Sequence, residues 1–344
     1  HCISSAASDV YKRQNIFLAF GIIAVLIMIF TFDMDYQELW MNLKRAGIYL
    51  PLVLLLWLFV YLINTVSWYI IIRSSGKTGF SFARLYKFTV TGFALNYVTP
   101  VGLMGGEPYR IMELKPYIGI ERATSSVILY VMMHIFSHFC FWLSSVLLYV
   151  CLYPVGWAMG MILGAITLFC LLIVILFIKG YQHGMAVAFV RMGSRIPFLK
   201  KKVVHFASAH KEKLENIDKQ IALLHQQKKQ TFYSALLLEY TARVVSCLEI
   251  WLILNVLTTN VSFADCCLIA AFSSLLANLL FFLPMQLGGR EGGFALAVGG
   301  LSLSGAYGVY AALITRVREM VWIVIGLALM KVGNFKQSKE KYSA

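Results

Sequence analysis

The chain has 344 residues, of which 60% are hydrophobic and 13% are charged, and its mean hydropathy is +0.75. A soluble domain of this length cannot bury so much apolar surface, so the composition excludes an ordinary globular protein and predicts a polytopic membrane protein. The formal net charge of +14 would suit a nucleic-acid partner. The Lys and Arg residues gather in loops between apolar segments, however, so we expect no nucleic-acid binding.

Residues 1–14 are polar, contain several Ser and Ala residues and do not begin with Met. We expect them to be a non-native or disordered tail and exclude them from the fold. The seven cysteines lie mostly in apolar segments, at spacings that fit no disulfide or metal framework. We interpret them as small buried hydrophobic residues.

Six apolar segments are long enough to cross a bilayer, which takes roughly 20 helical residues. The predicted spans are 15–32, 48–72, 122–150, 156–178, 231–258 and 306–330, within a single transmembrane domain over 15–333. The segment 179–230 carries eleven Lys and Arg residues and has apolar residues at helical spacing. We expect it to be a basic amphipathic segment on the cytoplasmic membrane surface, and 334–344 to be a basic cytoplasmic tail.

Two further apolar segments are short, and each ends at a proline that is followed by a Gly-Gly pair, a Glu and a returning helix. We interpret them, over 83–120 and 263–303, as re-entrant hairpins that enter and leave the membrane on the same side. The residues that would form their turns are Pro100, Gly105, Gly106, Pro284, Gly288 and Gly289.

The distribution of basic residues supports this interpretation. With both hairpins re-entrant, loop 73–122, loop 179–229 and the tail all fall on one face, and the opposite loops hold only Lys44 and Arg45. The positive-inside rule then places both termini in the cytoplasm and the chain in the cell (inner, cytoplasmic) membrane. Three spans separate the hairpins, so they enter from opposite sides. The predicted fold class is therefore all-α and polytopic, with six transmembrane helices and two re-entrant hairpins in an inverted repeat, an arrangement typical of transport sites.

Charged side chains within a membrane are costly, and ten lie in or near the predicted membrane region. Five are acidic and five are basic: Glu107, Glu239, Glu249, Glu291, Glu319, Arg110, Arg243, Arg290, Arg316 and Arg318. Glu107 and Glu291 follow the Gly-Gly turns. There a carboxylate can cap the returning helix or line a polar cavity, and both roles stay open.

Two acid–base pairs have the spacing of neighbours on one helix face. Glu239 and Arg243 are four residues apart, and Arg316 and Glu319 are three apart, so each pair can form an ion pair. Alternatively, Arg243, Arg316 or Arg318 holds an anionic headgroup, because a guanidinium group can bond two phosphate oxygens at once.

His134 and His138 lie four residues apart on a predicted span, a spacing that suits metal ligands. The HExxH motif is absent and no third ligand is obvious, so we expect a polar helix face and neither a metal nor another cofactor. Asn96 and Asn278, which precede the two prolines, complete the predicted cavity.

These motifs carry a family resemblance. Asn96 to Glu107 reads Asn-x-x-x-Pro followed by Gly-Gly-Glu, and Pro284 to Gly292 reads Pro-x-x-x-Gly-Gly-x-Glu-Gly with Arg316 downstream. Together they resemble the transmembrane, flippase-like region of the lysylphosphatidylglycerol synthases, over about residues 15–333. In bifunctional members this region moves aminoacylated phosphatidylglycerol across the bilayer, and a cytoplasmic domain makes that lipid from aminoacyl-tRNA. The resemblance implies a stand-alone member without the synthase domain.

We therefore expect a lipid translocase rather than an enzyme. It would move a phospholipid, an aminoacylated lipid or a polyprenyl-linked glycolipid, and its partner would be a membrane lipid with an anionic or zwitterionic headgroup. One alternative is a non-transporting partner or regulator of a separate lipid- or glycan-modifying enzyme, docked through 179–230. Another is an intramembrane enzyme that uses His134, His138 and a Glu. Whether the chain forms a homo-oligomer stays open.

Overall fold

The computed structural model describes residues 36–98, 105–183, 212, 229–258, 261–279, 289–301 and 303–342. These ranges contain helices and no strand, which confirms the all-helical class. The predictions for the tail 1–14, the span 15–32, most of the segment 179–230, and Pro100, Pro284 and Gly288 lie outside the described residues.

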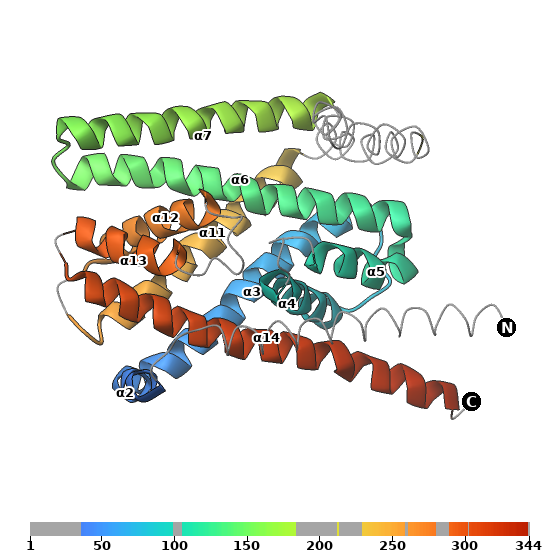
Figure 1. The fold of residues 1–344 in the computed structure, drawn as a ribbon. Helices are drawn as coiled ribbons and strands as arrows, with labels where there is room; N and C mark the ends of the chain where they lie inside the picture. The colour runs from blue at the N-terminus through green and yellow to red at the C-terminus, as the bar shows by residue number, and fades with distance from the viewer. Residues whose placement is uncertain are drawn as a thin grey trace, which may run out of the picture. The chain divides into compact units, whose positions relative to one another are not determined.

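Figure 1 shows the described helices, labelled in chain order. They are α2 (Tyr36–Ala46), α3 (Tyr49–Ser74), α4 (Phe82–Val98), α5 (Gly106–Ile118), α6 (Ile120–Leu152), α7 (Trp157–His183), α11 (Lys229–Leu254), α12 (Phe263–Leu279), α13 (Gly289–Gly300) and α14 (Gly305–Tyr342).

Three of these helices are long and apolar enough to cross a membrane: α3, α6, and α7 over Trp157–Ile175. They coincide with the predicted spans 48–72, 122–150 and 156–178, so the structure supports a helical membrane protein. The helices α11 and α14 cover the predicted spans 231–258 and 306–330. Both carry several charged side chains, and their crossing of a membrane stays a prediction.

Each predicted hairpin is a pair of short helices. α4 and α5 occupy the first, and α12 and α13 occupy the second. α4 and α12 have 17 residues each, somewhat fewer than the roughly 20 that a full crossing takes. Their re-entrant insertion and the inverted repeat remain predictions.

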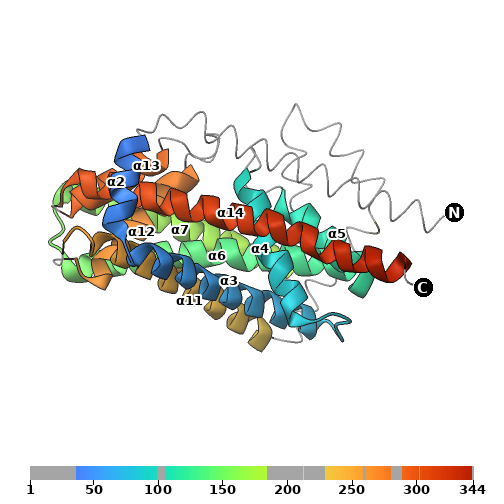
Figure 2. The same cartoon turned by 90° about the horizontal axis from the view of Figure 1, so that it is seen from below.

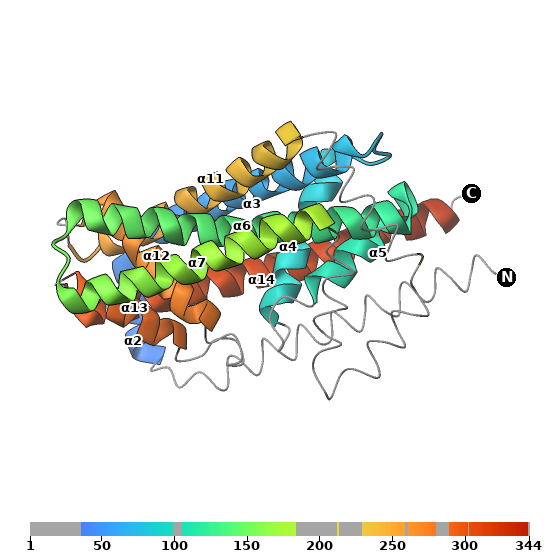
Figure 3. The same cartoon turned by 90° about the horizontal axis from the view of Figure 1, so that it is seen from above.

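The chain divides into two compact units. Unit 1 contains Phe82–Arg110, Val245–Ala344 and the chain up to Tyr61, and unit 2 contains Leu62–Ser81 and Ile111–Val244. In unit 2, α6 and α7 lie side by side (Figures 1 and 3). Tyr153, which precedes Pro154, has extended backbone angles and ends α6, as expected because a proline disfavours the helical conformation in the residue before it.

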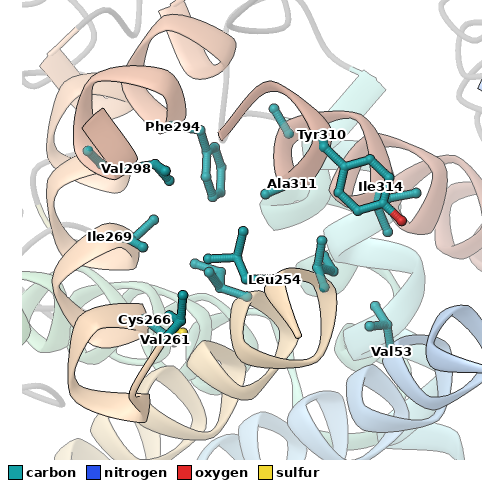
Figure 4. Packing of buried hydrophobic residues seen from close by; sticks show 14 of the residues in the cluster. Val53, Leu254, Val261, Cys266, Ile269, Phe294, Val298, Tyr310, Ala311 and Ile314 are labelled. Carbon is teal, nitrogen blue, oxygen red and sulfur yellow. The ribbon is translucent and has the colours of Figure 1, made fainter. Parts of the chain in front are cut away.

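In unit 1, α14 packs against a helix from each predicted hairpin, α13 and α4 (Figure 2), and α13 packs against α12. Figure 4 shows the apolar core that this arrangement buries. The core draws on α2, α3, α11, α12, α13 and α14 and includes Val53, Leu254, Cys266, Ile269, Phe294, Val298, Tyr310, Ala311 and Ile314.

Two glycines let α14 approach its neighbours closely. A Cβ atom added at Gly308 would meet the backbone of Phe294, and one added at Gly326 would lie 2.5 Å from the Cβ of Ala94. The Thr91 hydroxyl donates a hydrogen bond to the Gly326 carbonyl at 3.0 Å. Because apolar side chains gain little by leaving lipid for protein, such close backbone contacts hold membrane helices together. Both hairpins are thus fixed to α14.

Replacing Gly326 with Ala should force α4 and α14 apart and destabilise the protein by about 1–3 kcal/mol, the usual cost of overpacking. The measurement is the midpoint of thermal unfolding in detergent. Gly164→Ala in α7 is the matched control, because an added Cβ there has no neighbour within 4 Å among the described residues. Equal midpoints for the two variants would show that the α4–α14 contact is loose.

Candidate functional site

In the first predicted hairpin, the side chain of Asn96 joins α4 to the start of α5. Its Oδ1 accepts a hydrogen bond from the backbone N–H of Gly106 at 2.7 Å, and its Nδ2 donates to Oε1 of Glu107 at 2.9 Å. An amide on α4 thus satisfies a free N–H group at the start of α5. Glu107 lies in the first turn of α5, where the helix dipole stabilises a carboxylate. The capping role considered for Glu107 therefore falls to Asn96, with Glu107 bonded to it.

Arg110 is buried against α4. Its Nη1 donates to Oε1 of Glu107 at 3.3 Å, its Nη2 donates to the carbonyl oxygen of Thr89 at 3.3 Å, and its guanidinium carbon lies 4.8 Å from the centroid of the Phe93 ring. Gly92 provides the space, because a Cβ there would collide with Nε of Arg110. Arg110 therefore fastens α5 to α4.

Arg318 lies at the centre of a second group of buried polar residues in unit 1. Its Nε and Nη2 donate to the two carboxylate oxygens of Glu249 at 2.9 and 3.0 Å. Trp57 donates to the same carboxylate at 2.8 Å, and its ring centroid lies 3.8 Å from the Arg318 guanidinium carbon. Because Glu249 occupies the Nε–Nη2 edge of the guanidinium group, a phosphate could bind that edge only by displacing Glu249.

Arg316 and Glu319 form the within-helix ion pair that their spacing predicts, at 3.5 Å. Glu319 also lies 3.8 Å from Nη1 of Arg318. These two arginines, with Glu249 and Glu319, are all 5% exposed or less, and their formal charges balance. The charged set on α14, taken together with Glu249 of α11, is therefore formally neutral.

The second hairpin differs from the first in the contacts that are described. The side chain of Asn278 is exposed and donates to the carbonyl oxygen of Ser274, one turn back on α12, at 2.7 Å. Asn96, by contrast, bonds across to α5. Gly289 begins α13. The remaining residues predicted in this hairpin are outside the described positions, in whole or in their side chains: Pro284, Gly288, Arg290 and Glu291.

In unit 2, polar side chains on α6 meet polar side chains on α11. His134 Nδ1 lies 2.8 Å from Oε2 of Glu239. One turn on, Arg243 donates to Nδ1 of His138 at 2.8 Å and to the Ser137 hydroxyl at 3.0 and 3.3 Å. We name these five residues the α6–α11 polar face.

The spacing of four residues on each helix places these groups opposite one another. The sequence indicates that Glu239 and Arg243 share one face of α11, and the structure directs both side chains to α6. It also adds Ser137, which the sequence analysis missed. Its position between the two histidines is the only signal that could have identified it, because a serine on an apolar span is common.

The polar face is more open than the two buried sets of unit 1. The side chain of His134 is 26% exposed, whereas those of Arg110 and Arg318 are each 1% exposed. Glu239 is fully buried behind His134. Its second oxygen, Oε1, has no hydrogen-bond partner within the part of the chain that is described.

Across the described ranges, no group of three or more His, Cys, Asp and Glu side chains could hold a metal ion. Nδ1 of His138 receives a hydrogen bond from Arg243, and Nδ1 of His134 faces Glu239, so both nitrogens are already engaged by protein groups.

Comparison with known protein families assigns the chain to one of them. The family described as lysylphosphatidylglycerol synthase TM region matches residues 16–327. The chain belongs to this family. The match covers both hairpins, the α6–α11 polar face and the charged set on α14, and it supports a role connected with membrane lipids. No curated protein and no solved structure gives a significant match.

Glu249→Gln should destabilise the protein by about 3–5 kcal/mol, because it leaves Arg318 buried without its carboxylate. Arg318→Met should destabilise the protein by a similar amount, because it leaves Glu249 buried without its guanidinium partner. The double variant should lose less free energy of unfolding than the sum of the two single losses, since it leaves neither charge buried without a partner. Thermal unfolding of the four proteins measures this coupling. Additive losses would mean that the bidentate pair contributes little.

Proposed function

We propose that this chain moves a lipid with a phosphate-containing headgroup between the leaflets of its membrane. The α6–α11 polar face is the observation that carries the proposal. It places two histidines of α6, a helix apolar enough to span a bilayer, against the charged Glu239 and Arg243 of α11. Such groups are expensive at membrane depth, and they typically mark the path of a polar substrate.

Arg243 is the residue best suited to hold the headgroup. It is half-buried, and its guanidinium is oriented by neutral acceptors: Nδ1 of His138, the Ser137 hydroxyl and the backbone carbonyl of His134, the last at 3.0 Å. These bonds fix the direction of the group. Phosphate is a fitting ligand because it bonds two N–H groups of a guanidinium at once.

The surroundings of the polar face suit a lipid. Ile135, next to His134, is exposed, and so are Leu147 and Val150 further along α6. Acyl tails can remain against this apolar surface while the headgroup contacts Arg243. Phospholipids, aminoacylated lipids and polyprenyl-linked glycolipids all carry the phosphate that this arrangement would bind, and membership of the family supports a lipid substrate.

Arg243→Gln should slow lipid exchange by roughly tenfold or more, the value of one charged hydrogen bond lost from a bound headgroup. The assay follows labelled phosphatidylglycerol between leaflets of vesicles that contain the purified protein. The matched control is Arg73→Gln, because Arg73 is an exposed arginine of unit 2 whose described contacts are with Tyr69. It should exchange lipid at the rate of the unaltered protein.

Full exchange in Arg243→Gln would contradict the role of Arg243. If the unaltered protein accelerates no phosphate-containing lipid, the translocase itself is contradicted. The function to test next would then be the presentation of lipid to a separate modifying enzyme.

A further inference from the structure

We propose that the His134–Glu239 pair is a proton-binding site that takes up one proton for each anionic headgroup bound at Arg243. The inference rests on the proposed function and names the ion that drives it. Proton and headgroup would occupy the same polar face, one turn apart on α6 and α11, and would cross the membrane together.

Hydrogen-bond chemistry decides which histidine takes the proton. A guanidinium group only donates, so Nδ1 of His138, 2.8 Å from Nη1 of Arg243, must accept and cannot carry a hydrogen. His138 is thereby held as the neutral tautomer with its hydrogen on Nε2. His134 is not restricted in this way, because its Nδ1 faces a carboxylate at 2.8 Å. It is the histidine of the pair that can gain a proton.

The charges of the polar face couple the proton to the headgroup. With His134 neutral, the positive Arg243 and the negative Glu239 balance. A singly charged phosphate at Arg243 would leave one negative charge in excess, which is costly where water is scarce. A proton held between Nδ1 of His134 and Oε2 of Glu239 restores the balance. Each ligand therefore favours binding of the other, and this coupling is reciprocal.

The groups that the described helices bring near the pair are phenols and thiols. α11 adds Tyr240, whose hydroxyl donates to Ser144 of α6 at 2.9 Å. α6 itself adds Tyr130 and Cys140, and α7 adds the neighbouring thiol of Cys170. Phenol and thiol groups are ordinarily uncharged at neutral pH.

α3 faces the same part of α6 through Trp68, which stacks on Tyr130. The part of α3 that belongs to unit 2 also carries Arg73, which is exposed and donates to the hydroxyl of Tyr69. The charged groups that the described contacts place at the pair are therefore those of the polar face itself. The quarter of the His134 side chain that is exposed gives a proton a way in. Only N–H and O–H bonds form and break in this step.

The test is the distribution of labelled phosphatidylglycerol in vesicles containing the full chain, with a pH difference imposed across the membrane. If one proton accompanies each lipid, a gradient of one pH unit should drive about a tenfold steady-state asymmetry between the leaflets. An imposed membrane potential should drive none, because a bound anion and a proton together carry no net charge. An asymmetry that follows the potential and ignores the pH gradient would overturn the proposal.

Two variants test whether the pH-driven asymmetry depends on the His134–Glu239 pair. Glu239→Gln and His134→Gln should each reduce the asymmetry to about one, whatever exchange rate they retain. Tyr240→Phe is the control, because it removes a hydroxyl between the same two helices and leaves the His134–Glu239 contact in place. It should keep the tenfold ratio. Full asymmetry in Glu239→Gln would place the proton elsewhere and contradict the assignment.

A binding measurement separates this inference from the proposed function. A soluble short-chain phosphatidylglycerol is added to the purified protein in detergent, and proton uptake is followed with a pH indicator. Uptake that disappears in Glu239→Gln supports the proton site even if vesicles show no transport. Lipid binding without proton uptake overturns the coupling while leaving the translocase intact. Absence of both binding and transport overturns both.

Discussion

A buried polar side chain must find its partner within the protein, and the contacts between these helices follow from that requirement. Arg318 ties α14 to α11 through Glu249, and Arg110 fastens α5 to α4 through Thr89. Apolar contacts gain little when helices leave lipid for one another, so these bonds and the close approach at Gly326 fix the arrangement. Since α14 also packs against α13, the short helices of both hairpins are anchored to a single long helix.

The described charged groups divide into two kinds, and this division carries the functional argument. Arg110 and Arg318 are buried, with their guanidinium groups already bonded to carboxylates. Arg243 is only half-buried and is oriented by neutral acceptors. The first kind of site holds helices in place, and we propose that the second binds the ligand. Membership of the lysylphosphatidylglycerol synthase TM region family supports the proposal that the ligand is a membrane lipid.

What the sequence predicts well is local. Long apolar runs predict α3, α6 and α7, Pro154 marks the end of α6, and a spacing of three residues predicts the Arg316–Glu319 pair. Partners on other helices were not predictable, because a sequence does not say which helices pack together. The indole of Trp57 on Glu249 and the Asn96 cap of α5 both depend on tertiary packing. Asn96 and Asn278 also hold similar places in the two motifs, yet their described contacts differ.

The central claim is that the headgroup binds at the α6–α11 polar face. Photocrosslinking tests it most directly: a phosphatidylglycerol analogue with a photoreactive headgroup is incorporated with the protein, and the modified peptides are identified by mass spectrometry. The account predicts labelling around His134–His138 on α6 and Glu239–Arg243 on α11, displaced by excess unlabelled phosphatidylglycerol. Displaceable labelling confined to α14, around Arg316 and Arg318, would contradict it and place the headgroup on the charged set of that helix.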